Sequence, residues 1–478
     1  MLFNSFDFLV FFLIFYIVFF TSRGRLRLWI LLLASCVFYA WFIPKYLLIL
    51  FATIAIDYFA AMRIEDTDSE KRRKLSLLLG IFNTALILII FKYQNFFIDN
   101  VNWIASSNIP HLDLILPIGL SFHTFQSLSY VIDVYQKKIK AERDLLVYSN
   151  YVMMFPQLVA GPIERAGHLI PQIRTALTSR PEIENIVAGM MQFFYGLFKK
   201  VVVADSIAPY VDAVYGNQTF HTPTTLFVAS LLFAVQIYAD FSGYSDMAIG
   251  TARTLGIRFY DNFKTPYFSK SVSEFWRRWH TSLSSWIRDY VYFPLARSLG
   301  TLSKPKLFSV TLLTFALIGL WHGANWTFII FGLIQGAYIV LETLLSPYTQ
   351  KIFTVTKNTL LSKLYSVFSF VYVFLLFAIS LVFFRSSTVH EALYILSSFT
   401  EGLHIKDISF LDTTGFATIV FSTLLLFVGE ALFFNRYSFD ELIQKYGKVF
   451  PAIIAVSCVL LVLAFGQVDA IGFIYFQF

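Results

Sequence analysis

Long apolar runs, separated by short charged segments, limit what this chain can fold into more than any other feature. Several runs approach or exceed the roughly 20 residues that cross a bilayer as a helix, because the hydrocarbon core is about 30 Å thick and a helix rises about 1.5 Å per residue. With 57% hydrophobic and 14% charged residues, the 478-residue chain lies outside the usual composition of soluble globular proteins. The runs do not alternate apolar with polar residues, as the strands of a transmembrane barrel would. The sequence therefore predicts an all-α polytopic membrane protein.

The charged segments between the runs are mostly basic and predict the topology. The positive-inside rule places the most basic of them, residues 71–74, on the cytoplasmic side. Followed along the chain, these segments predict about ten or eleven transmembrane helices, besides re-entrant or interfacial helices, and place both termini on the extracytoplasmic side. The first run, 8–20, is followed rather than preceded by arginines, so we interpret it as a retained span and not as a cleaved signal. The net charge of +7 follows from this topology, and we expect no nucleic-acid partner.

Two apolar stretches are interrupted by proline, glycine and polar residues. They are residues 116–126, which end at Gln126, and residues 155–165. Irregular backbone at membrane depth is tolerated only where protein or a water-filled cavity surrounds it, so we expect the first stretch to face the protein interior. A third stretch, 186–207, has a helical pattern with two lysines, Lys199 and Lys200, inside it. This pattern suits a helix lying partly in the membrane interface.

Two carboxylates, Asp240 and Asp246, follow the apolar stretch 222–238. They could coordinate an ion or bind a polar ligand, or they could hydrogen-bond neighbouring helix ends and fix local geometry. We favour the second interpretation, because the segment lacks the ligand count of a dedicated metal site. The only two cysteines, Cys36 and Cys458, give neither a disulfide framework nor a metal-ligand spacing. The sequence therefore predicts no metal site.

An aromatic stripe surrounds His280. Between residues 273 and 297, large apolar side chains recur at three- and four-residue steps, which is typical of one face of a helix. They are Trp276, Trp279, Leu283, Trp286, Ile287 and Tyr290. Tryptophan and arginine at an apolar–polar border indicate a helix at the membrane surface. His280 lies at the edge of the stripe and can point inward, where a packing or capping role is the alternative to a functional one.

A second histidine, His322, lies between Trp321 and Trp326, where two apolar runs meet. An ionisable side chain at membrane depth is costly and is therefore a functional candidate. The alternative is that this imidazole donates to a backbone carbonyl and joins two helices. Asn325 follows three residues later, and so on the same helical face, where it could orient the imidazole or stabilise a developing oxyanion. It could equally satisfy a helix end.

Six motifs, in order along nearly the whole chain, resemble the membrane-bound O-acyltransferases, and more narrowly their bacterial branch that contains the membrane subunit of alginate O-acetylation. The motifs are Leu-Pro-Ile-Gly-Leu-Ser-Phe at 116–122, Ala-Gly-Pro-Ile-Glu-Arg at 160–165, Asp-Phe-Ser-Gly-Tyr-Ser-Asp at 240–246, Phe-Trp-Arg-Arg-Trp-His at 275–280, Gly-Leu-Trp-His-Gly at 319–323 and Phe-Ile-Tyr-Phe-Gln-Phe at 473–478. Six motifs in one order are far more specific than any one of them.

The resemblance implies a single membrane-embedded domain, residues 1–478, whose helices surround a central funnel or tunnel. Its segments would be N-terminal helices at 1–115, a catalytic core at 116–345, C-terminal helices at 346–466 and an extracytoplasmic aromatic tail at 467–478. By the same resemblance, His322 is the catalytic histidine at the narrow point, and His280 is the second signature residue, nearer the cytoplasm. The polar and aromatic residues expected to support the tunnel are Asp240, Asp246, Gln126 and Trp321.

Acyl transfer from a thioester to a hydroxyl needs a base, and imidazole suits this role because its unperturbed pKa, about 6.5, lies near working pH. The predicted function is a membrane O-acetyltransferase that moves acetyl from a cytosolic donor across the bacterial inner membrane, for O-acetylation of an exported polysaccharide such as alginate. Acetyl-CoA is the expected donor, an acyl carrier protein is the alternative, and no tightly bound cofactor is expected. The resemblance implies an extracytoplasmic esterase-like (SGNH) acetyltransferase as partner. Tyr475 is either an interface anchor or, as proposed for related systems, an acyl acceptor.

Other functions remain open at this point. Within the family they are D-alanyl transfer to teichoic acid and O-acetylation of peptidoglycan. From another class, a transporter or flippase would also show broken helices and intramembrane polar groups. Against a transporter, the sequence shows no paired short segments repeated between its two halves.

Overall fold

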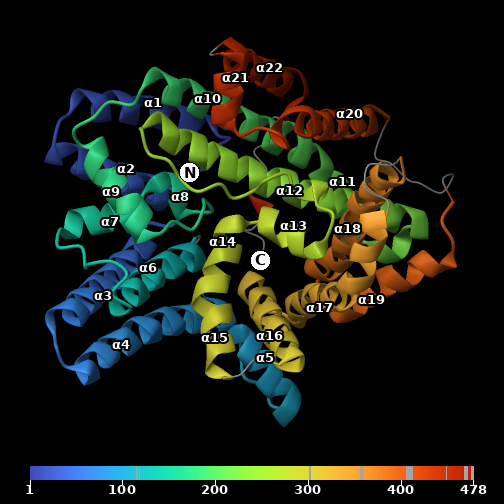
Figure 1. The fold of residues 1–478 in the computed structure, drawn as a ribbon, viewed down its shortest axis with the longest axis horizontal. Helices are drawn as coiled ribbons and strands as arrows, with labels where there is room; N and C mark the ends of the chain where they lie inside the picture. The colour runs from blue at the N-terminus through green and yellow to red at the C-terminus, as the bar shows by residue number, and fades with distance from the viewer. Residues whose placement is uncertain are drawn as a thin grey trace. The chain divides into compact units, whose positions relative to one another are not determined.

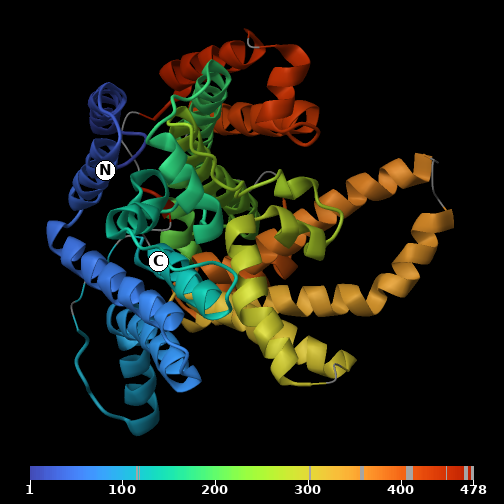
Figure 2. The same cartoon turned by 60° about the vertical axis from the view of Figure 1, so that its left-hand side comes forward.

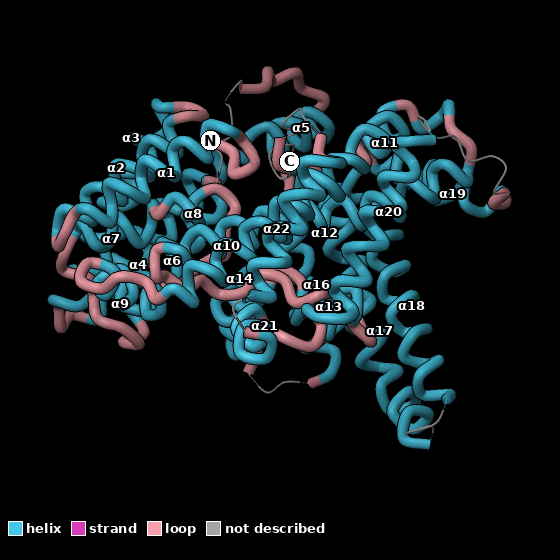
Figure 3. The backbone as a smooth tube through the Cα atoms, turned by 90° about the horizontal axis from the view of Figure 1, so that it is seen from above, coloured by secondary structure: helices cyan, strands magenta, loops and turns pink. Residues whose placement is uncertain are grey.

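A computed structural model describes residues 1–112, 114, 117, 119–300, 303–355, 360–404, 413–447, 449–467 and 472–474. Within these ranges every regular element is a helix or a helical turn, and there is no strand (Figures 1 and 3). Eight described segments are long and apolar enough to cross a membrane: Pro44–Asp66, Glu70–Ala105, Ile183–Gly216, Pro223–Thr254, Lys304–His322, Trp326–Pro347, Leu364–Arg385 and Thr414–Phe434. Two shorter apolar helices, Phe6–Thr21 and Val449–Phe465, also coincide with predicted spans. The all-α polytopic fold is confirmed.

The helices group into two compact units, of which the first comprises residues 1–196, 244–261 and 446–455. Its helices, besides the last part of α12 (Pro223–Thr254) and the first part of α22 (Val449–Phe465), are α1 (Phe6–Thr21), α2 (Arg25–Ala40), α3 (Leu47–Asp66), α4 (Glu70–Leu88), α5 (Gln94–Ala105), α6 (Leu120–Tyr135), α7 (Leu145–Met153), α8 (Phe155–Leu158), α9 (Ala166–Ala176) and α10 (Ile183–Leu197). Asp57 of α3 is fully buried, and its carboxylate accepts hydrogen bonds from Ser127 of α6 and Asn83 of α4. These donors compensate for burying the carboxylate and fasten three helices together.

A partly polar segment of the first unit is helical. α4 continues through a π-helical turn, Ile89–Tyr93, into α5, although α5 contains several polar side chains. The sequence reason is visible afterwards, because Phe97, Val101 and Ile104 recur at helical spacing among the polar residues.

The second unit comprises residues 197–243, 262–445 and 456–478, of which the tail is described at 472–474. Its helices, besides the last part of α22 (Val449–Phe465), are α11 (Asp205–Gly216), the first part of α12 (Pro223–Thr254), α13 (Val272–Arg278), α14 (Thr281–Ile287), α15 (Phe293–Ser298), α16 (Lys304–His322), α17 (Trp326–Val355), α18 (Leu360–Arg385), α19 (Val389–Ser398), α20 (Thr413–Gly429) and α21 (Phe439–Tyr446). Figure 2 shows α17 and α18, in orange, running out and back.

Close backbone contact between α16 and α17 fixes the end of α16. A Cβ atom added to Gly319 would lie 2.1 Å from the carbonyl oxygen of Phe328, and one added to Gly332 would lie 2.1 Å from that of Phe315. Small residues at such positions let two membrane helices approach backbone to backbone. Because Gly319 lies one turn before His322, this contact positions the histidine.

The predicted surface helix at 273–297 is not continuous. It breaks at His280, whose φ of 43° lies in the left-handed region, so α13 ends before it and α14 begins after it. The tryptophans of the aromatic stripe, Trp276, Trp279 and Trp286, are all buried. The break turns a single predicted helix into two short ones with the histidine at their junction.

Candidate active site

His322 is the last residue of α16 and lies among aromatic rings. It is buried, and the ring centroids of Trp321 and Phe384 lie 4.9 and 5.3 Å from its own. Phe331 of α17 approaches from another side at 6.3 Å. Three helices, α16 to α18, therefore hold this imidazole, which packs mainly against rings.

His280 is completely buried, and an asparagine orients it. Its Nδ1 lies 2.9 Å from Oδ1 of Asn262, which also accepts a hydrogen bond from the Ser282 hydroxyl at 2.8 Å. Because an amide oxygen can only accept, this contact places a proton on Nδ1 of His280. Burial lowers the pKa of the His280 imidazole to about 3, so the ring is neutral near pH 7. His280 lies between α13 and α14, outside the spanning helices.

One indole connects the two histidines. The Trp321 ring centroid lies 6.1 Å from that of His280 and 4.9 Å from that of His322. His280 and His322, which are 42 positions apart in the sequence, thus share one aromatic neighbour. The structure brings together both predicted histidines and the predicted supporting residue Trp321.

A cavity of about 610 Å³ lies beside these elements. It is lined by Ser273, Trp276, Arg277, Thr281, Ser284, Ser285, Ile287, Arg288, Tyr292, Thr314, Phe315, Ile318 and Ile339. Thr281 directly follows His280, and Ile318 lies one turn before His322 on α16. The lining combines two guanidinium groups, several hydroxyls and an apolar surface, a mixture that suits a ligand with an anionic part and a less polar part.

Asp240 belongs to a buried ion cluster. The Lys200 ammonium lies 2.8 Å from Oδ1 of Asp205 and 2.9 Å from Oδ1 of Asp240, and all three side chains are buried. The prediction of an interfacial helix around Lys199 and Lys200 is wrong for these side chains. Both are buried, because Lys200 has carboxylate partners inside the protein and Lys199 lies 5.5 Å from the centroid of the Tyr238 ring.

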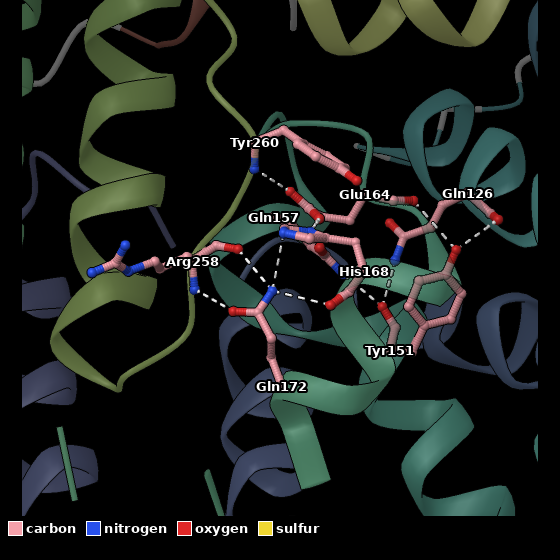
Figure 4. Close-up of polar contacts among 8 residues, drawn as sticks. All are labelled: Gln126, Tyr151, Gln157, Glu164, His168, Gln172, Arg258 and Tyr260. Carbon is pink, nitrogen blue, oxygen red and sulfur yellow. Dashed lines mark hydrogen bonds and ion pairs between the residues drawn. The ribbon is translucent and has the colours of Figure 1, made fainter. Parts of the chain in front are cut away.

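In the first unit, the motif at 160–165 forms part of a polar cluster (Figure 4). The buried carboxylate of Glu164 accepts from the Tyr260 backbone N–H at 2.6 Å and lies 2.8 Å from Nδ1 of His168. Burial raises the pKa of Glu164, and these two contacts oppose that rise. Gln172 exchanges two hydrogen bonds with the backbone of Arg258, at 2.8 and 3.0 Å. The cluster fastens α9 to the loop that follows α12.

The other predicted polar residues of the first unit have structural partners. Gln126 is buried and donates to the Tyr151 carbonyl, which Gln157 also contacts (Figure 4). Asp246 accepts from Gln192 at 3.0 Å. Among the described residues, no group of three or more histidine, cysteine or acidic side chains could hold a metal ion.

The expected shared helical face of His322 and Asn325 is wrong. Gly323 ends α16, and Asn325 lies before the first residue of α17. Its amide oxygen accepts from the Thr327 backbone N–H, and its nitrogen donates to the Ser387 carbonyl, each at 3.0 Å. This geometry agrees with the alternative that Asn325 satisfies a helix end.

Tyr475 lies outside the described residues, although Phe473 and Ile474 before it are described and buried.

Asn262 was missed by the sequence analysis. It lies in an irregular segment 18 residues before His280 and belongs to no periodic pattern or quoted motif. Only its polar character in a largely apolar chain could have drawn attention to it.

Comparison with known proteins identifies the family to which this chain belongs. The model of the MBOAT, membrane-bound O-acyltransferase family, matches residues 137–388. The chain is 36% identical to the probable alginate O-acetylase AlgI of Pseudomonas aeruginosa over 91% of this chain and 83% of that protein. It is 34% identical to the peptidoglycan O-acetyltransferase of Helicobacter pylori, over 77% of this chain and 73% of the relative. Similarity to the teichoic acid D-alanyltransferase of Bacillus subtilis is lower, at 26% over 51% of this chain and 62% of that protein. The chain belongs to the membrane-bound O-acyltransferase family.

Proposed function

We propose that this protein transfers acetyl from cytosolic acetyl-CoA across the bacterial inner membrane, for O-acetylation of an exported polysaccharide such as alginate. The observation that carries the proposal is that His280 and His322 share the ring neighbour Trp321, and that residues next to them, Thr281 and Ile318, line a cavity with Arg277 and Arg288. The relatives named as alginate O-acetylases supply the acceptor class.

The cavity is the proposed donor site. Guanidinium groups bind phosphate oxygens well, and Arg277 and Arg288 would receive the phosphates of CoA. The hydroxyls and apolar side chains of the same lining suit the pantetheine arm. The thioester would then reach the end of α16, because Thr314 and Ile318 of the lining precede His322 on that helix.

The transfer needs one base. The acceptor hydroxyl oxygen attacks the thioester carbonyl carbon while the His322 imidazole takes its proton; the C–S bond breaks, an ester C–O bond forms, and the imidazole returns the proton to the thiolate. In this proposal His280 lies next to the donor site, whose lining includes the following residue Thr281, and Asn262 positions His280 through Nδ1. Asn325, by holding the chain between α16 and α17, keeps the end of α16 in place.

Tyr475 is the proposed first acceptor, and it passes the acetyl group to an extracytoplasmic SGNH-type partner. The basic segments predict both termini on the extracytoplasmic side, which agrees with this route. O-acetylation of peptidoglycan is the second candidate, because a relative with that activity is 34% identical over 77% of this chain.

The test compares His322→Ala with His390→Ala, which removes an exposed imidazole at the start of α19. Membranes that contain either variant receive radiolabelled acetyl-CoA, and label is measured on the protein, on alginate and on peptidoglycan. We expect His322→Ala to lower transfer by about 10² to 10⁴-fold, the usual contribution of a positioned base, and His390→Ala to leave it unchanged. Full transfer by a normally folded His322→Ala variant would refute the catalytic assignment. Redistribution of a solute without acetyl transfer would favour a transporter.

A further inference from the structure

The buried ion cluster of the second unit contains more carboxylates than cations. Lys200 lies in the π-helical turn Phe198–Ala204 and contacts both Asp205 and Asp240 within 3 Å. Each of the three residues is only 2% exposed. Charges so deeply buried in a membrane protein are expensive and need further hydrogen-bond partners.

The C-terminal segment supplies those partners from its backbone. The N–H group of Ile474 donates to Oδ2 of Asp240 at 2.8 Å, and the Lys200 ammonium lies 3.4 Å from the carbonyl oxygen of Gly472. A carboxylate and an ammonium therefore hold an N–H and a C=O only two residues apart. The side chains of Phe473 and Ile474 are buried at this place, with 1% and 2% exposure.

A second contact fastens the start of the same segment. The N–H group of Gln467 donates to the Val201 carbonyl at 3.4 Å, and its side-chain amide lies 3.4 Å from the Ser206 hydroxyl. Val201 and Ser206 are neighbours of Lys200 and Asp205 in the sequence. The described ends of the tail, 466–467 and 472–474, are thus both bound along residues 200–206 and α12.

The bound segment lies one aromatic ring away from His280. The Phe473 and Phe241 ring centroids are 5.6 Å apart, and Phe241 meets the His280 ring edge to face at 4.7 Å. Asp240, which binds the C-terminal segment, and Phe241, which lies between that segment and His280, are consecutive residues of α12.

We propose that Asp240 and Lys200 form a docking site for this chain's own C-terminal segment, and that the docked segment presents Tyr475 to the acyl-transfer site. Presentation of Tyr475 rests on the proposed function; docking does not. The site recognises a backbone N–H and C=O flanking a buried aromatic residue. Asp205 serves as the second counter-ion of Lys200 and makes no contact with the tail that the proposal uses. Docking would hold the Tyr475 hydroxyl near the acyl-transfer site and so give this acceptor a high effective concentration there.

Docking can be measured without catalysis. In a background with Cys36→Ser and Cys458→Ala, Ile474→Cys is treated with N-ethylmaleimide in membranes, and the labelling rate is compared among Asp240 variants. Asp240→Ala removes the acceptor but leaves Lys200 paired with Asp205, so the protein should still fold. We expect labelling about tenfold faster or more, because a hydrogen bond to a charged group is lost. Asp240→Asn keeps an oxygen that accepts from Ile474, and Asp205→Asn removes the same charge without touching the tail; both should label slowly.

Acetyl transfer is then measured with the same Asp240 variants and native Ile474. Fast labelling together with a tenfold or larger loss of transfer in Asp240→Ala, and recovery of both in Asp240→Asn, would support docking and presentation. Equal, slow labelling of Ile474→Cys in Asp240→Ala and in its parent would overturn docking, whatever the activity. Fast labelling with unchanged polymer acetylation would overturn presentation of Tyr475, while the donor and His322 assignments would stand.

Discussion

The two units each contain a buried polar centre, and the centres are built differently. Around Glu164 in the first unit, the polar groups bond to one another and to loop backbone, as with the Tyr260 N–H at 2.6 Å (Figure 4). Around His322 in the second unit, three aromatic rings lie at centroid distances of 4.9 to 6.3 Å, and Ile318, one turn earlier on α16, lines the cavity. Hydrogen bonds of the first kind fix a chain in place, whereas a buried ionisable side chain near a cavity is a candidate for proton exchange with a ligand. We therefore assign structure to the first centre and chemistry to the second.

His280 lies between these extremes, because it has both ring neighbours and a hydrogen bond to Asn262. If it belongs to the chemical centre, its orientation should matter for the rate more than for folding. Replacing Asn262 therefore tests whether the role of His280 is structural or chemical.

Among the substitutions that test this comparison, Asn262→Ala should have the largest effect. The substitution leaves Nδ1 of His280 and the Ser282 hydroxyl without their shared acceptor. A lost buried hydrogen bond is worth about 1 to 3 kcal/mol, so the rate of acetyl transfer should fall about 5- to 150-fold. The measurement is initial transfer rate across pH, with Asn262→Asp as the variant that keeps an accepting oxygen and should recover most of the rate. A loss of stability with an unchanged rate of acetyl transfer per folded molecule would show that the role of His280 is structural.

The next effect is expected from Glu164→Ala, on stability rather than rate. The substitution leaves the buried Tyr260 N–H without its acceptor and removes the partner of His168. We expect the unfolding free energy to fall by about 1 to 3 kcal/mol. The rate of acetyl transfer per folded molecule should stay within about threefold of the parent, a smaller change than the loss of one hydrogen bond to a reacting group would cause. Unfolding is followed in detergent, and the exposed Glu182→Ala is the matched control, expected within about 0.5 kcal/mol of the parent.

A rate loss in Glu164→Ala much larger than in Asn262→Ala, with normal folding, would break the comparison. The first centre would then contribute to the reaction, and the division between structure and chemistry would have to be withdrawn.

The same contrast explains what the sequence could predict. Apolar runs and basic segments depend on local composition, so the helices were predictable, whereas the burial of Trp276, Trp279 and Trp286 was not predicted. The left-handed φ of His280 was not predictable, because the helical spacing continues on both sides of it and the residue is not a glycine. Contacts between distant segments, such as Lys200 with Asp240, depend on tertiary packing that periodicity does not encode. Asn325 shows the related error of extending a helical pattern past Gly323.

The smallest expected effect is the pH dependence of stability due to His280. Burial lowers the pKa of this imidazole from 6.5 to about 3, so between these values the unfolded chain binds a proton that the folded protein does not. Unfolding then takes up a proton, and stability falls as the pH falls below 6.5, by at most about 1.4 kcal/mol per pH unit for a single group. His280→Gln removes this group, so unfolding free energies measured at pH 5 and pH 7 should differ less in the variant than in the parent. Because the other titrating groups are common to both proteins, the difference isolates His280. An equal pH dependence would mean that the His280 pKa is the same in the folded and unfolded states, which would contradict the lowered pKa of the folded ring.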